Sequence, residues 1–448
     1  MNVLLIGQDA FRAQFASHGC EGMVTPNFDR LADSGVSFVQ NYCQIAPCAP
    51  SRVSTLTGCR PDTTKVYRNE DPPLGAANPG LVTLPHQFRK HGYTTCGVGQ
   101  VLHHMNKDDP QGWSEPLPKR TILEHQLPEN RAIVAAKLAA AGFSYGDYSR
   151  KLPGALWPPC KLGPRIECAD VSDDAYTDGK TTVAAIGRLR QLRDTPFFLA
   201  VGYTATHHPW FAPKRYWDLY DDDKLEQMGS TSQPGTEKRA LEHAYCACMS
   251  YLDAQLGMLL DELDRLGLTD KTVVALWADH GSGSGLIGEA PGPGRIGNAA
   301  GDAMFHVPLM IRAPGVAVRQ ARCEALTENV DLYPTLCELC GIPQPDGLEG
   351  TSLVPLMRDP ARAWKSAVFS QMGEGDGGMR HEMRTESYRL SLRGNAEASS
   401  NQGRVEPLAL HHVSDLRTDV MALPENRELL RDMTAKFRAG WRTAVGRR

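Results

Sequence analysis

The residues between positions 48 and 58 have the types and spacing of a reactive site. Cys48 is followed by Pro50 two residues later and by Arg52 four residues later, and an apolar run then ends in Thr57-Gly58. A thiolate is a nucleophile, although a free cysteine is more often a small buried hydrophobe. The fixed offsets favour the reactive interpretation. Because Pro50 suits the first turn of a helix, we expect Cys48 just before a helix N-terminus, where free amides favour an anion.

Acidic residues follow two of the predicted strands. Asp9 comes after the apolar run at residues 3–6, and Asp279-His280 follows the run at residues 272–277. A cation such as Ca²⁺ needs several oxygen ligands that converge from different strands, and loops at strand carboxyl ends commonly supply them. Taken alone, an Asp after a strand is as often a helix cap. Together with Cys48, these residues predict a metal site.

Two histidine pairs could transfer protons, because histidine titrates near neutral pH. His103 and His207 are the candidates, and the neighbouring His104 and His208 leave the register open by one residue. The alternative for each is a hydrogen-bonded structural histidine. For Arg52, the alternative to a fixed donor in the site is a surface ion pair.

The composition bounds the class of protein. The chain has 448 residues, 41% of them hydrophobic and 22% charged, and a formal net charge of −4. This length exceeds the size at which one core usually stops growing, so we expect two domains. The weakly acidic balance argues against nucleic acid or anionic membranes as partners, so an anion-binding site must be positive locally. No apolar run is long enough to span a membrane.

Alternation of strand-like and helical patterns predicts an α/β sheet with helices on both faces. The candidate strands are residues 3–6, 36–39, 93–98, 197–201, 272–277 and 307–311. Helices are predicted to start at Thr25-Pro26 and at Thr83. The clearest helix places leucines at 252, 256, 259, 260 and 263, which is a helical period. Residues 106–170 and 371–380 are rich in Gly and Pro, so we expect long loops at the rim of the site.

The composition of the sequence changes after a predicted helix at residues 329–341. A polar, Gly- and Pro-rich segment follows, which predicts a catalytic domain over residues 1–345 and a smaller α+β domain over residues 346–448. Strand-like runs at 366–370 and 388–392 and a charged helix from about 425 to 445 would form the second domain.

The stretch Cys48-Ala-Pro-Ser-Arg-Val-Ser, followed by Leu56-Thr-Gly58 and Arg60-Pro-Asp-Thr-Thr64, resembles the signature of the sulfatase family. Sulfatases belong to the alkaline-phosphatase-like superfamily, and the order of segments most resembles iduronate 2-sulfatase and its relatives. The similar segments are residues 2–12, 48–67, 98–103, 197–209, 278–289 and 306–315, with looser similarity at 383–385 and 388–389. The resemblance implies an alkaline-phosphatase-like sandwich, with a large mixed sheet flanked by helices and a smaller C-terminal α+β domain.

The resemblance also implies a nucleophile and its cofactors. In sulfatases the signature cysteine is oxidised to formylglycine by a formylglycine-generating enzyme, and the aldehyde hydrate attacks a sulfate ester. The implied metal, Ca²⁺ or Mg²⁺, would be bound by Asp9, Asp279, His280 and residue 48. Arg52 would hydrogen-bond the hydrate.

The same resemblance implies roles for the two histidines and a substrate. His207 would protonate the leaving alcohol or hold the sulfate, and His103 would take a proton from the second hydroxyl when sulfate is expelled. The substrate would be a sulfated saccharide, namely a 2-O-sulfated uronic acid of a glycosaminoglycan.

Three positions depart from the family pattern. The first strand normally ends in Asp-Asp but here ends in Asp9-Ala10, which removes a carboxylate that Gln8 or water could replace. Gln100 replaces a lysine that would bind the sulfate, and Arg295 falls at a second lysine position. We expect Gln100 and Arg295 to bind substrate and the activity to be reduced.

The departures leave two alternatives open. One is a catalytically impaired relative that binds sulfated glycans, and the other is a phosphodiesterase or phosphonate hydrolase of the same superfamily. Thr204 and Ala205 also replace a His-Lys pair that iduronate 2-sulfatase and its relatives have beside His207. The substrate is therefore the least constrained part of the prediction.

The sequence does not determine the cellular compartment of the protein. The resemblance implies a lysosomal or secreted protein, but a strand is predicted from Asn2 without room for a signal peptide, and no Asn-x-Ser/Thr sequon occurs. Cys160 and Cys168 flank a short loop, and a disulfide and two free thiols are equally compatible with their spacing.

Overall fold

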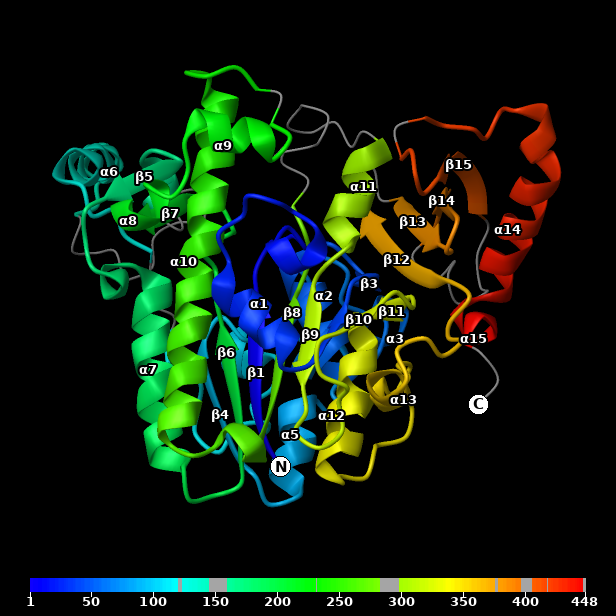
Figure 1. Cartoon of the computed structure of the whole chain (residues 1–448), viewed down its shortest axis with the longest axis horizontal. Coiled ribbons are helices and arrows are strands. Elements are labelled where there is room, and N and C mark those ends of the chain that lie inside the picture. The colour runs from blue at the N-terminus through cyan, green and yellow to red at the C-terminus, as the bar shows by residue number, and fades with distance from the viewer. Residues whose placement is uncertain are drawn as a thin grey trace.

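A seven-stranded mixed sheet forms the centre of the molecule (Figure 1). The computed structural model describes residues 1–119, 123–144, 159–230, 232–282, 298–374, 378–395, 405–416 and 418–445. The strand order is β10-β2-β9-β8-β1-β6-β4. The strands are β1 (Asn2–Gln8), β2 (Val36–Phe38), β4 (Thr94–Gly99), β6 (Phe197–Gly202), β8 (Thr272–Ala278), β9 (Leu309–Arg312) and β10 (Ala321–Cys323). All six predicted strands are present, and the predicted α/β fold is confirmed.

Only β9 runs against its neighbours in this sheet. It pairs antiparallel with β2 and β8, whereas β8, β1, β6 and β4 are successive parallel neighbours. The carboxyl ends of these four strands therefore meet at one edge of the sheet, which is where open α/β sheets bind ligands.

Helices cover both faces of the sheet, because the side chains of β1 alternate between two hydrophobic cores. Leu4 and Ile6 pack with α1 (Pro26–Asp33), α7 (Thr177–Leu192) and α10 (Glu237–Arg265). Val3 and Leu5 pack with the opposite layer, which consists of α2 (Cys48–Thr57), α5 (Leu84–Lys90), α12 (Leu332–Cys340) and α13 (Val354–Arg358). Apolar burial on both faces is typical of a parallel sheet between helical layers.

The predicted helices are present, with one correction at the reactive cysteine. The five leucines of the clearest helical pattern are all buried on α10. Pro50 lies in the first turn of α2 as expected, but the helix begins at Cys48 itself, with Pro47 as the N-cap. Cys48 is therefore the first helical residue and does not precede the helix.

The prediction of long loops at residues 106–170 and 371–380 is wrong in part. The first segment contains α6 (Pro128–Ala140) and β5 (Ile166–Ala169), which pairs with β7 (Trp210–Pro213). The α6 sequence is rich in alanine, which is a strong helix former. The prediction missed the helix because it used the composition of the whole segment, in which Gly and Pro on either side of α6 are frequent. Residues 371–373 and 379–380 belong to strands of the C-terminal sheet.

A separate antiparallel sheet forms the C-terminal domain, shown in orange to red in Figure 1. Its strands, in spatial order, are β12 (Val368–Gly373), β13 (Met379–Arg384), β14 (Tyr388–Gly394) and β15 (Val405–His412). The predicted final helix is divided into α14 (Arg427–Ala439) and α15 (Trp441–Ala444), because Gly440 between them adopts φ 80°. Phe437 of α14 packs on Met383 and Leu390 in a core of its own. The boundary between residues 345 and 346 stays a prediction.

Candidate active site

The parallel strands bring the predicted site residues to one edge of the sheet. Asp9 follows β1, Asp279-His280 follows β8, Gln100 follows β4 and His207 lies beyond β6. The N-terminus of α2 delivers Cys48 to the same place, with its thiol 3.1 Å from His280 Nε2. Residues far apart in the sequence are thus adjacent because their strands are neighbours.

Four buried side chains form what we call the metal cluster: Asp9, Cys48, Asp279 and His280. Their potential ligand atoms all lie within 4.8 Å of one another. Cys48 Sγ is 3.6 Å from Asp9 Oδ1, and His280 Nε2 is 3.8 Å from Asp9 Oδ1 and from Asp279 Oδ1. The arrangement can hold one cation, and these are the four residues that the sequence assigned to the metal.

Arg52 and Gln100 fix the two carboxylates of the metal cluster. Arg52 Nε donates to Asp279 Oδ2 at 2.8 Å, and Arg52 Nη2 lies 3.3 Å from Asp9 Oδ2. Gln100 Nε2 also donates to Asp9 Oδ2, at 2.6 Å. One oxygen of each carboxylate is therefore held from behind, while each Oδ1 faces His280. Arg52 is fully buried, which excludes the surface ion pair.

The orientation of His280 follows from its second nitrogen. His280 Nδ1 lies 2.7 Å from the backbone oxygen of Gly281. Because a carbonyl oxygen can only accept, Nδ1 must carry the proton, and the lone pair of Nε2 then faces the Cys48 thiol. The Cys48 thiol also donates to Asp9 Oδ1, at 3.6 Å. A backbone acceptor of this kind is the usual means of orienting a metal-binding histidine.

Burial and excess negative charge shift the ionisation of the metal cluster. Burial raises the pKa of the Cys48 thiol well above its usual value, the carboxylates of Asp9 and Asp279 raise it further, and Arg52 opposes them. Burial also raises the pKa of Asp279, an effect that Arg52 opposes and the neighbouring Asp9 strengthens. With two carboxylates and one guanidinium, the site lacks a positive charge that a bound cation would supply.

The departure at Ala10 leaves the backbone turn in place. Ala10 adopts φ 53°, in the left-handed region, and its N–H donates to Asp279 Oδ1 at 3.1 Å. Asp and Asn enter this region more readily than Ala, so the turn suits the residue that the family pattern has there. Gln8, which could replace the lost carboxylate, shares the face of β1 with Leu4 and Ile6.

The histidine loops lie at the same edge of the sheet. Thr206 in the second loop donates its hydroxyl to the backbone oxygen of Asp9 at 2.7 Å, which ties this loop to the metal cluster. His207 Nδ1 is 2.7 Å from the backbone oxygen of His208. Burial lowers the pKa of His208 to about 4, His207 lowers it further, and Asp9 acts in the opposite direction. The His103 and His104 rings lie edge to face, 5.0 Å apart.

Sequence reasoning missed Asp178, which holds the loop after β6. The backbone N–H groups of Thr204 and Ala205 donate to Asp178 Oδ2 at 2.9 and 2.5 Å. Burial raises the pKa of Asp178 to about 6, although these hydrogen bonds oppose the shift. No motif could have found it, because Asp178 lies on α7, far in sequence from the loop. Predicted Arg295 and the side chain of Cys160 lie outside the described residues, and Cys168 is a free thiol.

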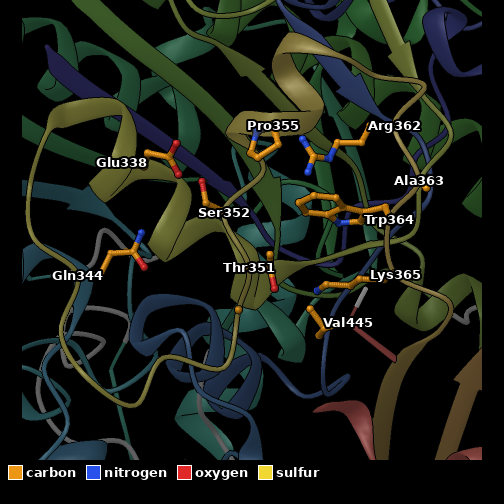
Figure 2. A pocket seen from close by; sticks show the side chains of 11 residues that line it. Glu338, Gln344, Thr351, Ser352, Pro355, Arg362, Ala363, Trp364, Lys365 and Val445 are labelled. Atoms are coloured by element: carbon orange, nitrogen blue, oxygen red, sulfur yellow. The ribbon is translucent and has the colours of Figure 1, made fainter. Parts of the chain in front are cut away.

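A cavity of about 330 Å³ lies away from these residues, between α12, α13 and residues 362–365 (Figure 2). Trp364 and Arg362 line it from one side and Glu338 and Gln344 from the other. Lys365 borders it, but the Lys365 ammonium is bound by Glu328 and Asp331. None of the predicted site residues lines this cavity.

Comparison with solved structures defines the class of fold. The chain superposes on a phosphonate monoester hydrolase of Agrobacterium radiobacter with a TM-score of 0.72 and 22% identity, covering 98% of this chain and 95% of the other. It also superposes on a 2-O glycosaminoglycan sulfatase with a TM-score of 0.68 and 18% identity, covering 97% and 90%. These likenesses establish an alkaline-phosphatase-like α/β fold.

Sequence comparison defines the family. The sulfatase family profile matches residues 1–342, and a profile described as N-sulphoglucosamine sulphohydrolase, C-terminal, matches residues 301–392. The chain belongs to the sulfatase family and is a sulfuric ester hydrolase. It is 30% identical to iduronate 2-sulfatase of Mus musculus over 410 residues, covering 77% of this chain and 69% of that protein. It is 28% identical to a sulfatase of Formosa agariphila, covering 87% and 78%.

Proposed function

We propose that this sulfatase removes sulfate from a 2-O-sulfated uronic acid of a glycosaminoglycan, after Cys48 has been converted to formylglycine by a formylglycine-generating enzyme. The observation that carries the proposal is the convergence of Cys48 with Asp9, Asp279 and His280 in front of Arg52. A nucleophile precursor, a cation site and a fixed guanidinium are the parts that sulfate transfer to residue 48 needs.

The residues around position 48 would bind the metal and orient the nucleophile. Asp9, Asp279, His280 and residue 48 would hold a divalent metal, which supplies charge that stabilises an ionised hydroxyl on residue 48. Arg52 is tied to both carboxylates and would orient residue 48 by hydrogen bonds.

The remaining residues would act on the substrate. His207 would give a proton to the departing sugar oxygen, and His103 would accept one when sulfate leaves. Gln100 would hold Asp9 in place and donate to the sulfate, and we propose Arg295 as a second sulfate ligand. The N-terminus of α2 adds partial positive charge beside residue 48.

The substrate assignment rests on sequence similarity. The chain is 29% identical over 440 residues to a human protein named iduronate 2-sulfatase, covering 84% of this chain. Thr204 and Ala205 depart from the pattern of iduronate 2-sulfatases beside His207, so the sugar specificity has to be tested by assay.

The test is sulfate release by protein co-produced with a formylglycine-generating enzyme. Substrates are a 2-O-sulfated uronic acid disaccharide, a 6-O-sulfated glucosamine and a phosphonate monoester. We expect turnover of the first, loss of that turnover in Cys48→Ala, and retention in Cys43→Ala, which removes another buried free thiol. Faster turnover of the sulfated glucosamine would overturn the sugar assignment, and turnover of the phosphonate alone would overturn the sulfatase mechanism.

A further inference from the structure

The donor atoms of the metal cluster are not those that Ca²⁺ or Mg²⁺ prefers while residue 48 is a thiol. The atoms that face one another are Cys48 Sγ, His280 Nε2, Asp9 Oδ1 and Asp279 Oδ1. Ca²⁺ takes six to eight oxygen ligands and Mg²⁺ an octahedral set of oxygens. One sulfur, one imidazole nitrogen and two carboxylate oxygens instead suit Zn²⁺, which binds Cys, His and Asp in fours.

The second oxygen of each carboxylate is held by groups outside the metal cluster. Asp9 Oδ2 accepts from Gln100 and lies beside Arg52, and Asp279 Oδ2 accepts from Arg52. Each carboxylate thereby turns its Oδ1 toward His280. Ala10 stands where the family pattern has another carboxylate, and its N–H points at Asp279.

Four separations between the donor atoms are close to those of a tetrahedron around zinc. Zn–S of about 2.3 Å and Zn–N and Zn–O of about 2.0 Å require ligand atoms about 3.3 to 3.6 Å apart. The observed separations are 3.1 Å from Cys48 Sγ to His280 Nε2, 3.6 Å from Sγ to Asp9 Oδ1, and 3.8 Å from Nε2 to each Oδ1. All four donor atoms lie within 4.8 Å of one another, so the metal cluster is compact enough for a four-coordinate ion.

Two of the four ligands are already oriented for a metal. The bond from His280 Nδ1 to the Gly281 oxygen aims the Nε2 lone pair into the metal cluster. Arg52 fixes Asp279 in the same way from behind. Charge also favours the ion, because two carboxylates face one guanidinium.

We infer that the thiol form of this protein has a zinc site at Asp9, Cys48, Asp279 and His280, and that this form binds Zn²⁺ in preference to Ca²⁺. Binding replaces the thiol hydrogen by the metal and releases that proton to solvent. The inference goes beyond the proposed function, which assigns Ca²⁺ or Mg²⁺ to the site after Cys48 has been converted. It does not depend on that conversion.

The test uses full-length protein made without a formylglycine-generating enzyme, with the thiol at residue 48 verified by peptide mass. After chelation, Co²⁺ alone is added as a spectroscopic probe, followed by Zn²⁺ or Ca²⁺ as competitors. We expect one equivalent of Co²⁺ to give a thiolate-to-cobalt charge-transfer band. Stoichiometric Zn²⁺ should remove the band, whereas Ca²⁺ in roughly thousandfold excess should not, as ligand type dictates.

Matched cysteine variants locate the sulfur. Cys48→Ser should abolish the band and weaken Zn²⁺ binding at least about 100-fold, since a side chain that binds the metal directly is lost. Cys43→Ser should leave the band and the Zn²⁺ affinity unchanged. Absence of the band in the unsubstituted protein, or its removal by equimolar Ca²⁺, would overturn the inference even if Cys48→Ser fails to fold. The band is independent of sulfate release, so its absence is distinguishable from failure of the proposed function.

Discussion

Two buried regions of this protein contain carboxylates paired with cationic side chains, but they differ in charge balance. In the metal cluster, Asp9 and Asp279 share a single cation, Arg52. In a second region, which we call the interdomain network, two carboxylates meet two cations. Its members are Arg60, Glu328, Asp331 and Lys365, and all four are buried.

The interdomain network has equal numbers of positive and negative groups, which are linked by hydrogen bonds. Arg60 Nη2 lies 2.7 Å from both oxygens of Glu328, and Lys365 Nζ donates to Glu328 and Asp331 at 2.7 to 2.8 Å. Although burial opposes it, the two cations bring the pKa of Glu328 down to about 2. Lys365 immediately precedes the C-terminal sheet, so the network joins that sheet to the main domain.

The two regions differ in charge balance, and this difference distinguishes a network that stabilises the fold from a site that binds a cation. A balanced buried network keeps its geometry without a further ion, whereas removal of one member leaves a charge uncompensated. The metal cluster has two carboxylates for one guanidinium. Burial and, to a lesser degree, the neighbouring Asp9 raise the pKa of Asp279, and the excess negative charge makes the cluster a cation site. Loss of a charged group from the metal cluster should therefore abolish sulfate release, whereas loss of a charged group from the interdomain network should lower the free energy of unfolding.

The largest expected effect is on catalysis, from Asp279→Asn. Sulfate release should fall at least about 10³-fold, because the metal loses a charged ligand. The metal-free protein should be as stable as the unsubstituted one or more stable, since repulsion from Asp9 is relieved. Steady-state kinetics and urea unfolding measure the two effects. A strongly destabilised variant would show that Asp279 belongs to the scaffold.

Lys365→Met should do the reverse. Two buried carboxylates would share one cation, and breaking a buried ion pair costs about 3 to 5 kcal/mol of unfolding free energy. Turnover per folded molecule should change less than about threefold, because Lys365 contacts no residue of the metal cluster. Denaturant titration checks the first expectation and active-site titration the second. Unchanged stability would remove the contrast between the regions.

Asp178 is a third buried carboxylate to compare with those of the two regions. It is bonded to N–H and O–H groups instead of a cation. Its folded pKa of about 6 lies above the usual 3.8, so its stabilising contribution is complete below pH 4 and lost as the pH rises through 6. The loss amounts to about 3 kcal/mol.

Asp178→Asn should abolish this pH dependence. The amide oxygen can still accept from Thr204 and Ala205, which both donate to one oxygen of Asp178. Unfolding free energies at pH 4, 5, 6 and 7 for both proteins provide the measurement. Parallel curves for the two proteins would contradict the assignment.

The smallest effect is expected from Ala10→Asp, which supplies the carboxylate of the family pattern. Because Ala10 already has φ 53°, a conformation that Asp tolerates, little backbone cost should arise. Ca²⁺ affinity should rise about tenfold, in line with an added charged oxygen ligand. Calorimetric titration tests this, with Ala10→Asn as the uncharged control. Equal affinities for the two variants would assign the gain to backbone conformation.

Sequence reasoning reached the metal cluster because each of its members adjoins a strand or a motif. Asp9 and His280 follow buried strands, and Cys48 lies in a segment with fixed offsets. Parallel strand order then brings them together, a rule that needs no side-chain detail. Six of the seven strands of the main sheet were predicted because most of them are continuous apolar runs, whereas the short strand β10 was not predicted.

Other features could not be predicted because they depend on contacts distant in sequence. The bonds from Arg52 to Asp9 and Asp279 are set by packing, and the motif alone left a surface ion pair open. Asp178 and the interdomain network carry no local signal. The α6 helix was hidden by Gly and Pro on either side of it.

The most direct test of the central claim relates conversion of Cys48 to activity. Preparations made with different amounts of formylglycine-generating enzyme would be analysed by mass spectrometry of the peptide containing residue 48. Each would then be assayed for sulfate release from the 2-O-sulfated uronic acid disaccharide. We predict turnover proportional to the aldehyde fraction and none from the all-thiol preparation. Equal turnover from thiol and aldehyde preparations would contradict the account.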